Sequence, residues 1–258
     1  MIHPTAVIDP GAELGTDVTV GAYAVIGPKV IIGDGCFIGP HALVESHVRM
    51  GKGNRISPFA SIGAPPQDIK FRGEDTWVDI GDNNLIREYV SINRGAPNGR
   101  GTRIGNNNMI MSYCHIAHDC DIGNRVVMAN AATFAGHITV EDGANIGWMV
   151  AVHQFVRIGA LCIIGGTSGV GKDVPPYVTA APFRQGKNNL FGLNMIGLKR
   201  NGISKENISV LKKAYTMIFR SEETLRESIT RVEAELPRTP EVAHLIEFIN
   251  KSERGVLR

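Results

Sequence analysis

Aliphatic residues recur along this chain every six positions, in one phase that is kept over most of its length. Counting in steps of six from Ile2 to Val170 gives 29 positions, and 26 of them are Ile, Val, Leu, Met or Phe. The three exceptions are Asp68, Glu74 and Asn98. Neither a helical nor a plain strand period keeps one phase over such a distance, whereas a solenoid of short strands joined by tight corners does.

Small residues and glycines complete the six-residue unit. A small residue stands four positions after most of the aliphatic ones, so the two positions alternate inward as a strand requires. Glycine often follows the aliphatic residue, which suits corners that need a positive φ or a close backbone approach. Three units make one triangular coil of 18 residues, and successive coils are expected to stack about 4.8 Å apart.

The pattern is interrupted twice, at residues 63–79 and 93–103. Both interruptions preserve the phase, so we expect two loops that project from an intact stack. Such loops often form the binding face of a repeat protein. We expect the first loop to reach the histidine-bearing edge described below, most economically on a neighbouring copy of the chain.

Helical spacing replaces the six-residue period after Val170. Apolar residues at helical intervals predict three amphipathic helices, beginning near Ser204, Ser221 and Thr239, with the second ended by Pro237. We therefore predict a mainly β protein of two parts: a parallel β-helix over residues 1–180 and a helical domain over residues 181–258.

Composition restricts the possible functions. The four cysteines, Cys36, Cys114, Cys120 and Cys162, all occupy the inward small position, which predicts reduced thiols packed in the core. The repeats begin at residue 2 and no apolar run approaches the roughly 18 residues of a membrane span, so we expect a cytoplasmic protein. Aromatic residues make up 6% of the chain and do not alternate with basic ones, which argues against nucleic-acid binding.

Charge is distributed unevenly between the two parts. Residues 184–258 hold 14 Lys and Arg against 9 Glu, a balance of +5, while residues 1–183 hold 13 Lys and Arg against 16 acidic residues, a balance of −3. This pattern fits an acidic partner that docks near the helical domain. It fits an ordinary solvated helical surface equally well.

Four of the eight histidines, His115, His118, His137 and His153, lie within 39 residues. His118, Gly136 and Gln154 each stand two positions after an inward aliphatic residue, so they are expected to stack on successive coils. His115 should lie directly beneath Thr133. Imidazole has the ordinary pKa that suits base catalysis near neutrality, and the neighbouring Asp119 could fix its tautomer.

Several motifs make the chain resemble the UDP-N-acetylglucosamine O-acyltransferases, a family of hexapeptide-repeat acyltransferases that opens lipid A synthesis. The resemblance rests on His115-Ile116-Ala117-His118-Asp119-Cys120, Ala135-Gly136-His137, Ala151-Val152-His153-Gln154-Phe155, Gln67-Asp68-Ile69-Lys70, Asp173-Val174-Pro175-Pro176-Tyr177, Gly197-Leu198-Lys199-Arg200 and the ending Arg254-Gly255-Val256-Leu257-Arg258. It implies a left-handed β-helix and a homotrimer, which flat-sided prisms also favour.

The resemblance also implies roles for single residues. His118 would be the general base that takes the proton of the sugar 3-hydroxyl as it attacks the thioester of an acyl carrier protein, with a 3-hydroxyacyl chain as the expected cargo. Asp119 would orient His118, and the Gly136 N–H would stabilise the oxyanion. No metal and no cofactor of its own is implied, because phosphopantetheine arrives on the carrier. The substrate-binding residues would be Gln67, Asp68, Lys70, His115, His137, His153, Gln154, Asn194 and Arg200.

Some positions depart from the family pattern or stay open. Ile196 replaces an expected acidic residue, Asn201 replaces an expected second arginine, and the stretch from Pro182 to Asn189 is about three residues longer than usual. Gly166 stands where the family places the floor of its acyl groove, and it is equally well explained as a corner glycine. The sequence leaves the acyl length open, and also whether the acceptor is a 3-hydroxyl or a 3-amino sugar.

Three alternatives compete with this interpretation. A zinc enzyme of the γ-carbonic anhydrase type would use His115, His118 and His137 as ligands, but it would not carry this helical tail. The sister N-acyltransferase of the same pathway usually has an additional domain ahead of its repeats. A purely structural solenoid would not need four histidines on one edge.

Overall fold

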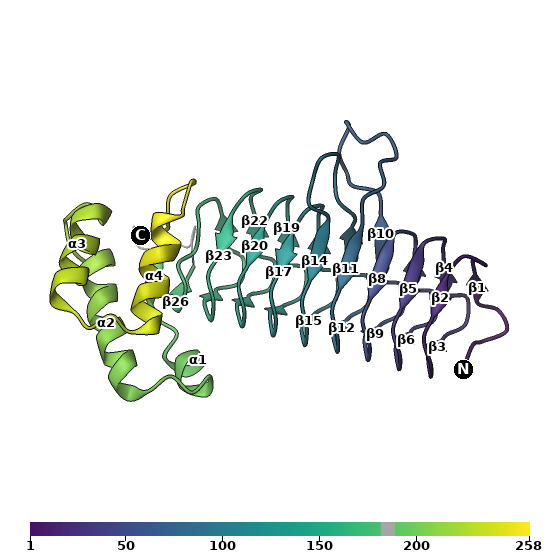
Figure 1. Ribbon diagram of the computed structural model, residues 1–258, viewed down its shortest axis with the longest axis horizontal. Coiled ribbons are helices and arrows are strands. Elements are labelled where there is room, and N and C mark those ends of the chain that lie inside the picture. Colours follow the sequence, from purple (N-terminus) through teal and green to yellow (C-terminus); the bar gives the residue numbers. More distant parts are fainter. Residues whose placement is uncertain (182–188) are drawn as a thin grey trace.

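The computed structural model describes residues 1–181 and 189–258. Short strands coil into a left-handed parallel β-helix of triangular section, and helices gather at its C-terminal end (Figure 1). The predicted fold class is confirmed. Each side of the prism is one sheet, and strands one coil apart pair in parallel, as in Val7 with Val25 and Ile8 with Ile26.

Three sheets form the sides. Sheet A contains β3 (Thr19–Val20), β6 (Phe37–Ile38), β9 (Arg55–Ile56), β12 (Leu85–Ile86), β15 (Met109–Ile110), β18 (Val127–Met128), β21 (Asn145–Ile146), β24 (Ile163–Ile164), β26 (Val178–Ala180) and β27 (Leu190–Leu193). Sheet B contains β1 (Val7–Ile8), β4 (Val25–Ile26), β7 (Leu43–Val44), β10 (Ser61–Ala64), β13 (Ser91–Asn93), β16 (His115–Ile116), β19 (Thr133–Phe134), β22 (Ala151–Val152) and β25 (Gly169–Val170). Sheet C contains β2 (Glu13–Leu14), β5 (Val30–Ile32), β8 (Val48–Met50), β11 (Val78–Ile80), β14 (Thr102–Ile104), β17 (Asp121–Ile122), β20 (Thr139–Val140) and β23 (Arg157–Ile158).

The six-residue series forms the core of the coil. From Ile26 to Ile164 its aliphatic members are at most 4% exposed, and full burial of one such side chain contributes about 1.5–3 kcal/mol. All four cysteines are buried free thiols, as predicted. The core continues without a break into the helical domain.

Corner glycines serve close packing between coils. A Cβ at Gly27 would lie 1.8 Å from the carbonyl oxygen of Glu45 on the next coil. Left-handed φ angles fall mostly on corner residues other than glycine, among them Asp119 at 60° and His137 at 62°. The coil therefore places functional side chains at corner positions where a free loop would favour glycine or asparagine.

Both projecting loops leave the prism between sheet B and sheet C. The first joins β10 to β11 through residues 65–77, and the second joins β13 to β14 through residues 94–101. They rise side by side above the coil in Figure 1. Because each loop replaces whole six-residue units, the register of the sheets continues on either side, as in Val78 with Val48 and Ser91 with His115.

The described residues contain four helices, whereas the sequence predicted three. They are α1 (Met195–Arg200), α2 (Lys205–Phe219), α3 (Leu225–Glu235) and α4 (Pro240–Asn250). α1 escaped prediction because its six residues are too few to show a period. The N-cap of α3 is Thr224 rather than Ser221, because Glu227 completes a capping box with Thr224.

The helical domain is fixed to the last coils by contacts from its C-terminal segment. Val256 bridges to Asp173, the Leu257 N–H donates to the Asp173 carbonyl, and the Arg157 guanidinium lies 4.3 Å from the centre of the Phe248 ring. None of the described helices is long and apolar enough to cross a membrane. The unusual length noted for residues 182–189 falls, except for Asn189, outside the described residues.

Candidate active site

Three edges with different chemistry separate the sheets. The histidine edge, between sheets B and C, carries both loops and the corners 117–119, 135–137, 153–155 and 171–173. The asparagine edge, between sheets C and A, includes the corners 105–107, 123–125, 141–143 and 159–161. At the first three of these corners an Asn or Asp side chain accepts an N–H group of the preceding coil. The aromatic edge, between sheets A and B, stacks the rings of Tyr23, His41, Phe59, Tyr89 and Tyr113 at 4.9–5.2 Å.

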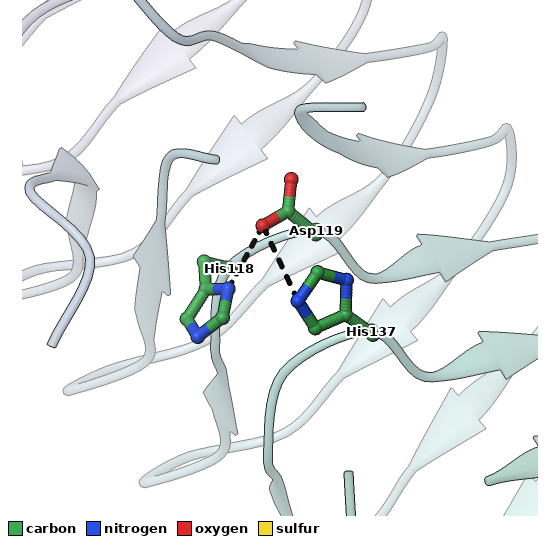
Figure 2. A group of neighbouring side chains, drawn as sticks. All are labelled: His118, Asp119 and His137. Carbon is green, nitrogen blue, oxygen red and sulfur yellow. Dashed lines mark hydrogen bonds and ion pairs between the residues drawn. The ribbon is translucent and has the colours of Figure 1, made fainter. Parts of the chain in front are cut away.

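His118 and Asp119 form the centre of the histidine edge (Figure 2). The Nδ1 atom of His118 lies 2.8 Å from Oδ2 of Asp119, and Nε2 of His137 lies 3.9 Å from the same oxygen. Only 1% of the Asp119 side chain is exposed, against 16% for His118. The carboxylate is therefore held inside the protein while the imidazole reaches the surface.

The second loop encloses the Asp119 carboxylate. Its two oxygens accept the N–H groups of Ala96, at 2.9 Å, and Gly101, at 3.0 Å. A Cβ at Gly99 would lie 1.9 Å from Oδ1 of Asp119, so only glycine lets the loop close this tightly. Burial acts to raise the pKa of Asp119, but the hydrogen bonds from His118 and the loop outweigh it and hold that pKa below its ordinary value.

An ionised Asp119 determines the tautomer of His118. A carboxylate without a proton only accepts hydrogen bonds, so Nδ1 of His118 carries the proton and Nε2 of the neutral ring is left as the basic atom. This is the arrangement that general base catalysis by histidine requires.

Gly136 lies against the face of that imidazole. A Cβ at this position would come within 2.5 Å of Cε1 and 2.7 Å of Nε2 of His118, so the predicted stacking of the two residues is present. The neighbouring amides of Ala135 and His137 donate to Val152 and His118 carbonyls. Among the described residues, none accepts a hydrogen bond from the Gly136 N–H, which leaves a donor beside the basic nitrogen.

Two further histidines border this centre. The ring of His137 packs edge-on against His118 at 5.1 Å and stacks on Phe155 at 4.6 Å. His115 pairs with Thr133 across sheet B, as expected, and its Nδ1 lies 2.8 Å from the Ser91 hydroxyl. Burial lowers the pKa of both His115 and His137. Both rings therefore stay neutral down to a lower pH than an exposed histidine does.

The first loop lies over the same edge of the same chain. Asp68 is near enough to His137 for its charge to act against the lowered pKa of that ring. The Asp68 carboxylate also accepts the Lys70 N–H at 2.9 Å, and the Phe71 ring that follows lies 5.1 Å from the Arg94 guanidinium. Gln67 and Lys70 are exposed at the surface of the loop. The loop therefore approaches the histidines of its own chain.

The remaining predicted residues lie at different distances from the centre. His153 and Gln154 are exposed one coil above Gly136. Asn194 caps α1 by accepting the Gly197 N–H and donates to the Leu161 carbonyl, so it lies at the asparagine edge together with the helix that ends at Arg200. Gly166 lies at the aromatic edge one coil above Trp148, whose indole Nε1 would be 2.4 Å from a Cβ there. Within one chain Asn194, Arg200 and Gly166 therefore lie at other edges than His118.

Sequence reasoning missed several contributors to the centre. Ala96, Gly99 and Gly101 hold Asp119 from a loop whose path has no local signal. Phe155 could have been found, because it stands 18 residues after His137 and must stack on it. Asp119, His118 and His137 also offer ligand atoms within 4.8 Å of one another. The zinc alternative expected His115 as a ligand, and His115 is not in this group. The Asp119 oxygens already accept three hydrogen bonds, from His118, Ala96 and Gly101.

Family comparisons first define the class. The bacterial transferase hexapeptide model matches residues 29–64 and 101–136, so the coil and its histidine edge belong to a hexapeptide-repeat transferase. A second model, Udp N-acetylglucosamine O-acyltransferase domain 2, matches residues 173–257.

Individual relatives then define the family. The acyl-[acyl-carrier-protein]--UDP-N-acetylglucosamine O-acyltransferase of Thermodesulfovibrio yellowstonii is 53% identical over 258 residues, covering 100% of this chain and 99% of the relative. The solved UDP-N-acetylglucosamine acyltransferase of Bacteroides fragilis is 42% identical, with a TM-score of 0.96 and full coverage of both chains. That of Campylobacter jejuni is 37% identical, with a TM-score of 0.92, covering 100% of this chain and 99% of that one. The chain belongs to the UDP-N-acetylglucosamine O-acyltransferase family.

Proposed function

We propose that this protein transfers an acyl chain from acyl carrier protein to the 3-hydroxyl of UDP-N-acetylglucosamine, the first step of lipid A synthesis. Full-length relatives near 50% identity carry this activity in their names. The observation that carries the chemistry is the His118–Asp119 pair, with its basic nitrogen directed away from the carboxylate and beside a glycine whose N–H has no acceptor among the described residues. The predicted location stays the cytoplasm.

The proposed reaction needs one base and one oxyanion donor. Nε2 of His118 takes the proton of the sugar hydroxyl while its oxygen bonds to the thioester carbon. The oxyanion that forms accepts the Gly136 N–H. When the intermediate collapses, the carbon–sulfur bond breaks, and the imidazolium returns the proton to the leaving sulfur, so the products are an ester and a free thiol. No cofactor of the enzyme takes part.

Asp119 stabilises the charged form of His118 during this cycle. Its ionised carboxylate is prevented from turning away by the Ala96 and Gly101 amides, so the imidazole stays oriented in both protonation states. General base catalysis of this type contributes about 10² to 10⁴ in rate.

The two loops of the histidine edge are the proposed acceptor site. Asp68 and Lys70 belong to the first loop, which leaves the coil on the N-terminal side of His118. There a sugar hydroxyl and a diphosphate could meet a carboxylate and an ammonium group. His115, His137, His153 and Gln154 line the same edge and would contact the sugar and the acyl group. Asn194 and Arg200 are proposed for the nucleotide, but they lie on the asparagine edge.

A trimer would bring these two edges together. The outward residues of sheet C are mostly charged and alternate in sign along Arg49, Asp79, Arg103 and Asp121. Those of sheet B carry no Lys, Arg, Asp or Glu: Val7, Val25, Leu43, Ser61, Ser91, His115, Thr133, Ala151 and Gly169. Sheet A shows one arginine, Arg55, among mainly apolar or neutral residues. Sheet C is therefore suited to solvent, and sheets A and B to neighbouring copies.

The geometry of three prisms follows from this assignment. The aromatic edge, which separates sheets A and B, would lie nearest the threefold axis, and sheet B of one copy would face sheet A of the next. The histidine edge of one copy would then lie beside the asparagine edge of its neighbour. Asn194 and Arg200 of that neighbour would complete the nucleotide site, which supports the homotrimer proposed from the family resemblance.

The activity is tested with the purified chain, UDP-N-acetylglucosamine and a mixed pool of acyl carrier proteins. Mass spectrometry of the products should show a single acyl group added as an ester, which mild alkali removes, together with free carrier thiol. An alkali-stable amide product would assign the sister reaction instead. Absence of any acyl product would overturn the proposed function.

A further inference from the structure

The column of corner residues that contains His118 continues beyond the proposed active site. His118, Gly136 and Gln154 stand at equal intervals of one coil, and the next member is Lys172. The strands that set this register, β16, β19, β22 and β25, pair without a shift. Lys172 therefore lies three coils above His118, or about 14 Å at the usual strand spacing.

A second cation stands beside Lys172. The Arg254 guanidinium donates to the Gly171 carbonyl through Nε at 3.3 Å and Nη2 at 3.2 Å. It comes from the C-terminal segment after α4, which in Figure 1 rises beside the last coils on the side of the two loops. Two positive charges from distant parts of the sequence thus meet at the C-terminal end of the histidine edge.

Neither cation is neutralised by an acidic side chain within the described residues. The nearest carboxylate in sequence, that of Asp173, is 1% exposed and turned inward, where it accepts the Ser252 hydroxyl and the Arg157 N–H. Glu253 is exposed and forms no ion pair with Arg254 among these residues. Lys172 is exposed and its ammonium group has no partner there.

A cavity lies at this end of the edge, and small outward side chains follow below it on sheet B. The cavity, of about 460 Å³, is lined by Gly169, Gly171, Lys172, Asn189, Val256, Leu257 and Arg258. Below Gly169 on sheet B the outward residues are Ala151 and Thr133. Their small side chains leave a path along the sheet, and Gly136 has no side chain that could obstruct it at the corner.

We propose that Lys172 and Arg254 bind the phosphate of the phosphopantetheine arm that carries the acyl group. This proposal rests on the proposed function. From its phosphorus to its sulfur an extended arm measures roughly 16 Å by standard bond lengths, close to the three-coil separation of Lys172 and His118. A phosphate held by the two cations would deliver the thioester to the space beside His118 and Gly136.

The arrangement separates the two substrates along one edge. The acceptor sugar is assigned to the loops on the N-terminal side of His118, and the donor arm to the coils on its C-terminal side. The free thiol can then leave along the donor path without crossing the acceptor. Phosphate binding by a lysine and an arginine is a common use of both side chains.

The test compares two donors that lack a carrier protein, acyl-phosphopantetheine and acyl-pantetheine, with acyl carrier protein alongside. The wild-type chain should use the phosphorylated donor with a kcat/KM about three- to tenfold higher. In the double variant Lys172→Ala, Arg254→Gln this preference should disappear, because only the phosphorylated donor loses rate. The KM for UDP-N-acetylglucosamine should stay unchanged.

Controls separate this effect from others. Lys213→Ala removes a positive charge from the exposed face of α2 and should keep the donor preference. Lys172→Ala alone should lower the preference without changing the melting temperature, because its side chain is exposed. An equal loss with both small donors, or a loss confined to the carrier protein, would overturn the phosphate site. A wild-type chain inactive with every donor would overturn the proposed function itself.

Discussion

The properties of His118 depend on residues that touch its ring and on residues that touch its partner. Asp119 determines the tautomer of His118, and the amides of the second loop hold the Asp119 carboxylate in place. Gly136 leaves space at the face of the ring. The sequence allowed the first and the last of these to be predicted, from adjacency and from the spacing of 18 residues. The loop amides could not be predicted, since their approach to Asp119 depends on the folded path of residues 94–101.

Replacing Gly136 with alanine tests the space at that ring. The new methyl group would lie 2.5 Å from Cε1 of His118, so the imidazole must move from its position beside the free amide. We expect Gly136→Ala to lower kcat by about 100-fold or more, because a base displaced by about 1 Å no longer reaches the proton it must take. Steady-state kinetics measures this. The control Gly11→Ala meets only the Asp9 side chain, at 3.2 Å, and should retain full activity.

The roles given to the substrate-binding residues stay predictions at this scale. Asp68 and His115 lie near the centre, as the sequence suggested, whereas Asn194 uses both ends of its amide to hold α1. Sequence spacing alone cannot tell whether such an asparagine caps a helix or binds a nucleotide.

Elements of the coil were predictable because one short pattern repeats. The strands follow from the six-residue series, and the two loops follow from its interruptions. The helical part was less predictable: α1 is too short to show a period, and the start of α3 depends on a capping box rather than on the first serine in the region. Local patterns fix repeated elements well and single short ones poorly.

A ladder of asparagines inside the coil makes a prediction at the scale of elements. Oδ1 of Asn54 accepts the N–H of Asn84, and Oδ1 of Asn84 accepts the N–H of Asn108, all within the buried core. Asn84→Val leaves the Asn108 N–H without its acceptor. We expect a loss of about 1–3 kcal/mol in the free energy of unfolding, measured by urea denaturation. Asn106→Ser, on the exposed asparagine edge, should lose less than half as much.

The stability that His47 contributes at the base of the first loop should be lost in acid. His47 lies between Lys29, Arg94 and Asp75 at the base of this loop, and burial, then Arg94 and Lys29, lower its pKa. A histidine with a lowered pKa in the folded state contributes stability that is full above its ordinary pKa of about 6.5 and is lost as the pH falls. The same sign applies to His115 and His137.

Thermal melting across pH measures this effect. The melting temperature of the wild-type chain should fall between pH 7.5 and pH 5.5, and His47→Gln should show a shallower fall because one titrating group has been removed. A wild-type melting temperature that rises with acid, or a variant with the same slope, would contradict the assignment.

The whole molecule distributes its chemistry over three edges and three faces. One face is charged, two are nearly uncharged, and the edge between the uncharged faces is a stack of aromatic rings. Sequence periodicity assigns every residue of the regular coil to a face or an edge, so this distribution was available before the structure. Which edges meet between copies depends on the assembled shape.

Subunit mixing tests the assembly. His118→Ala and Arg200→Ala should each be inactive alone, while trimers formed by refolding them together should recover about a quarter of the wild-type sites, because one interface in each mixed trimer has both native residues. Activity and light scattering measure the outcome. Lack of recovery in confirmed mixed trimers would contradict a site that His118 and Arg200 of neighbouring copies share.

The most direct test of the account is the rate of acyl transfer by His118→Ala, with the melting temperature measured in parallel. The side chain is at the surface of a corner and contributes little to the core, so the melting temperature should stay nearly unchanged while the rate falls by about 10² to 10⁴. A variant that keeps more than about a tenth of the wild-type rate would contradict the assignment of His118 as the base.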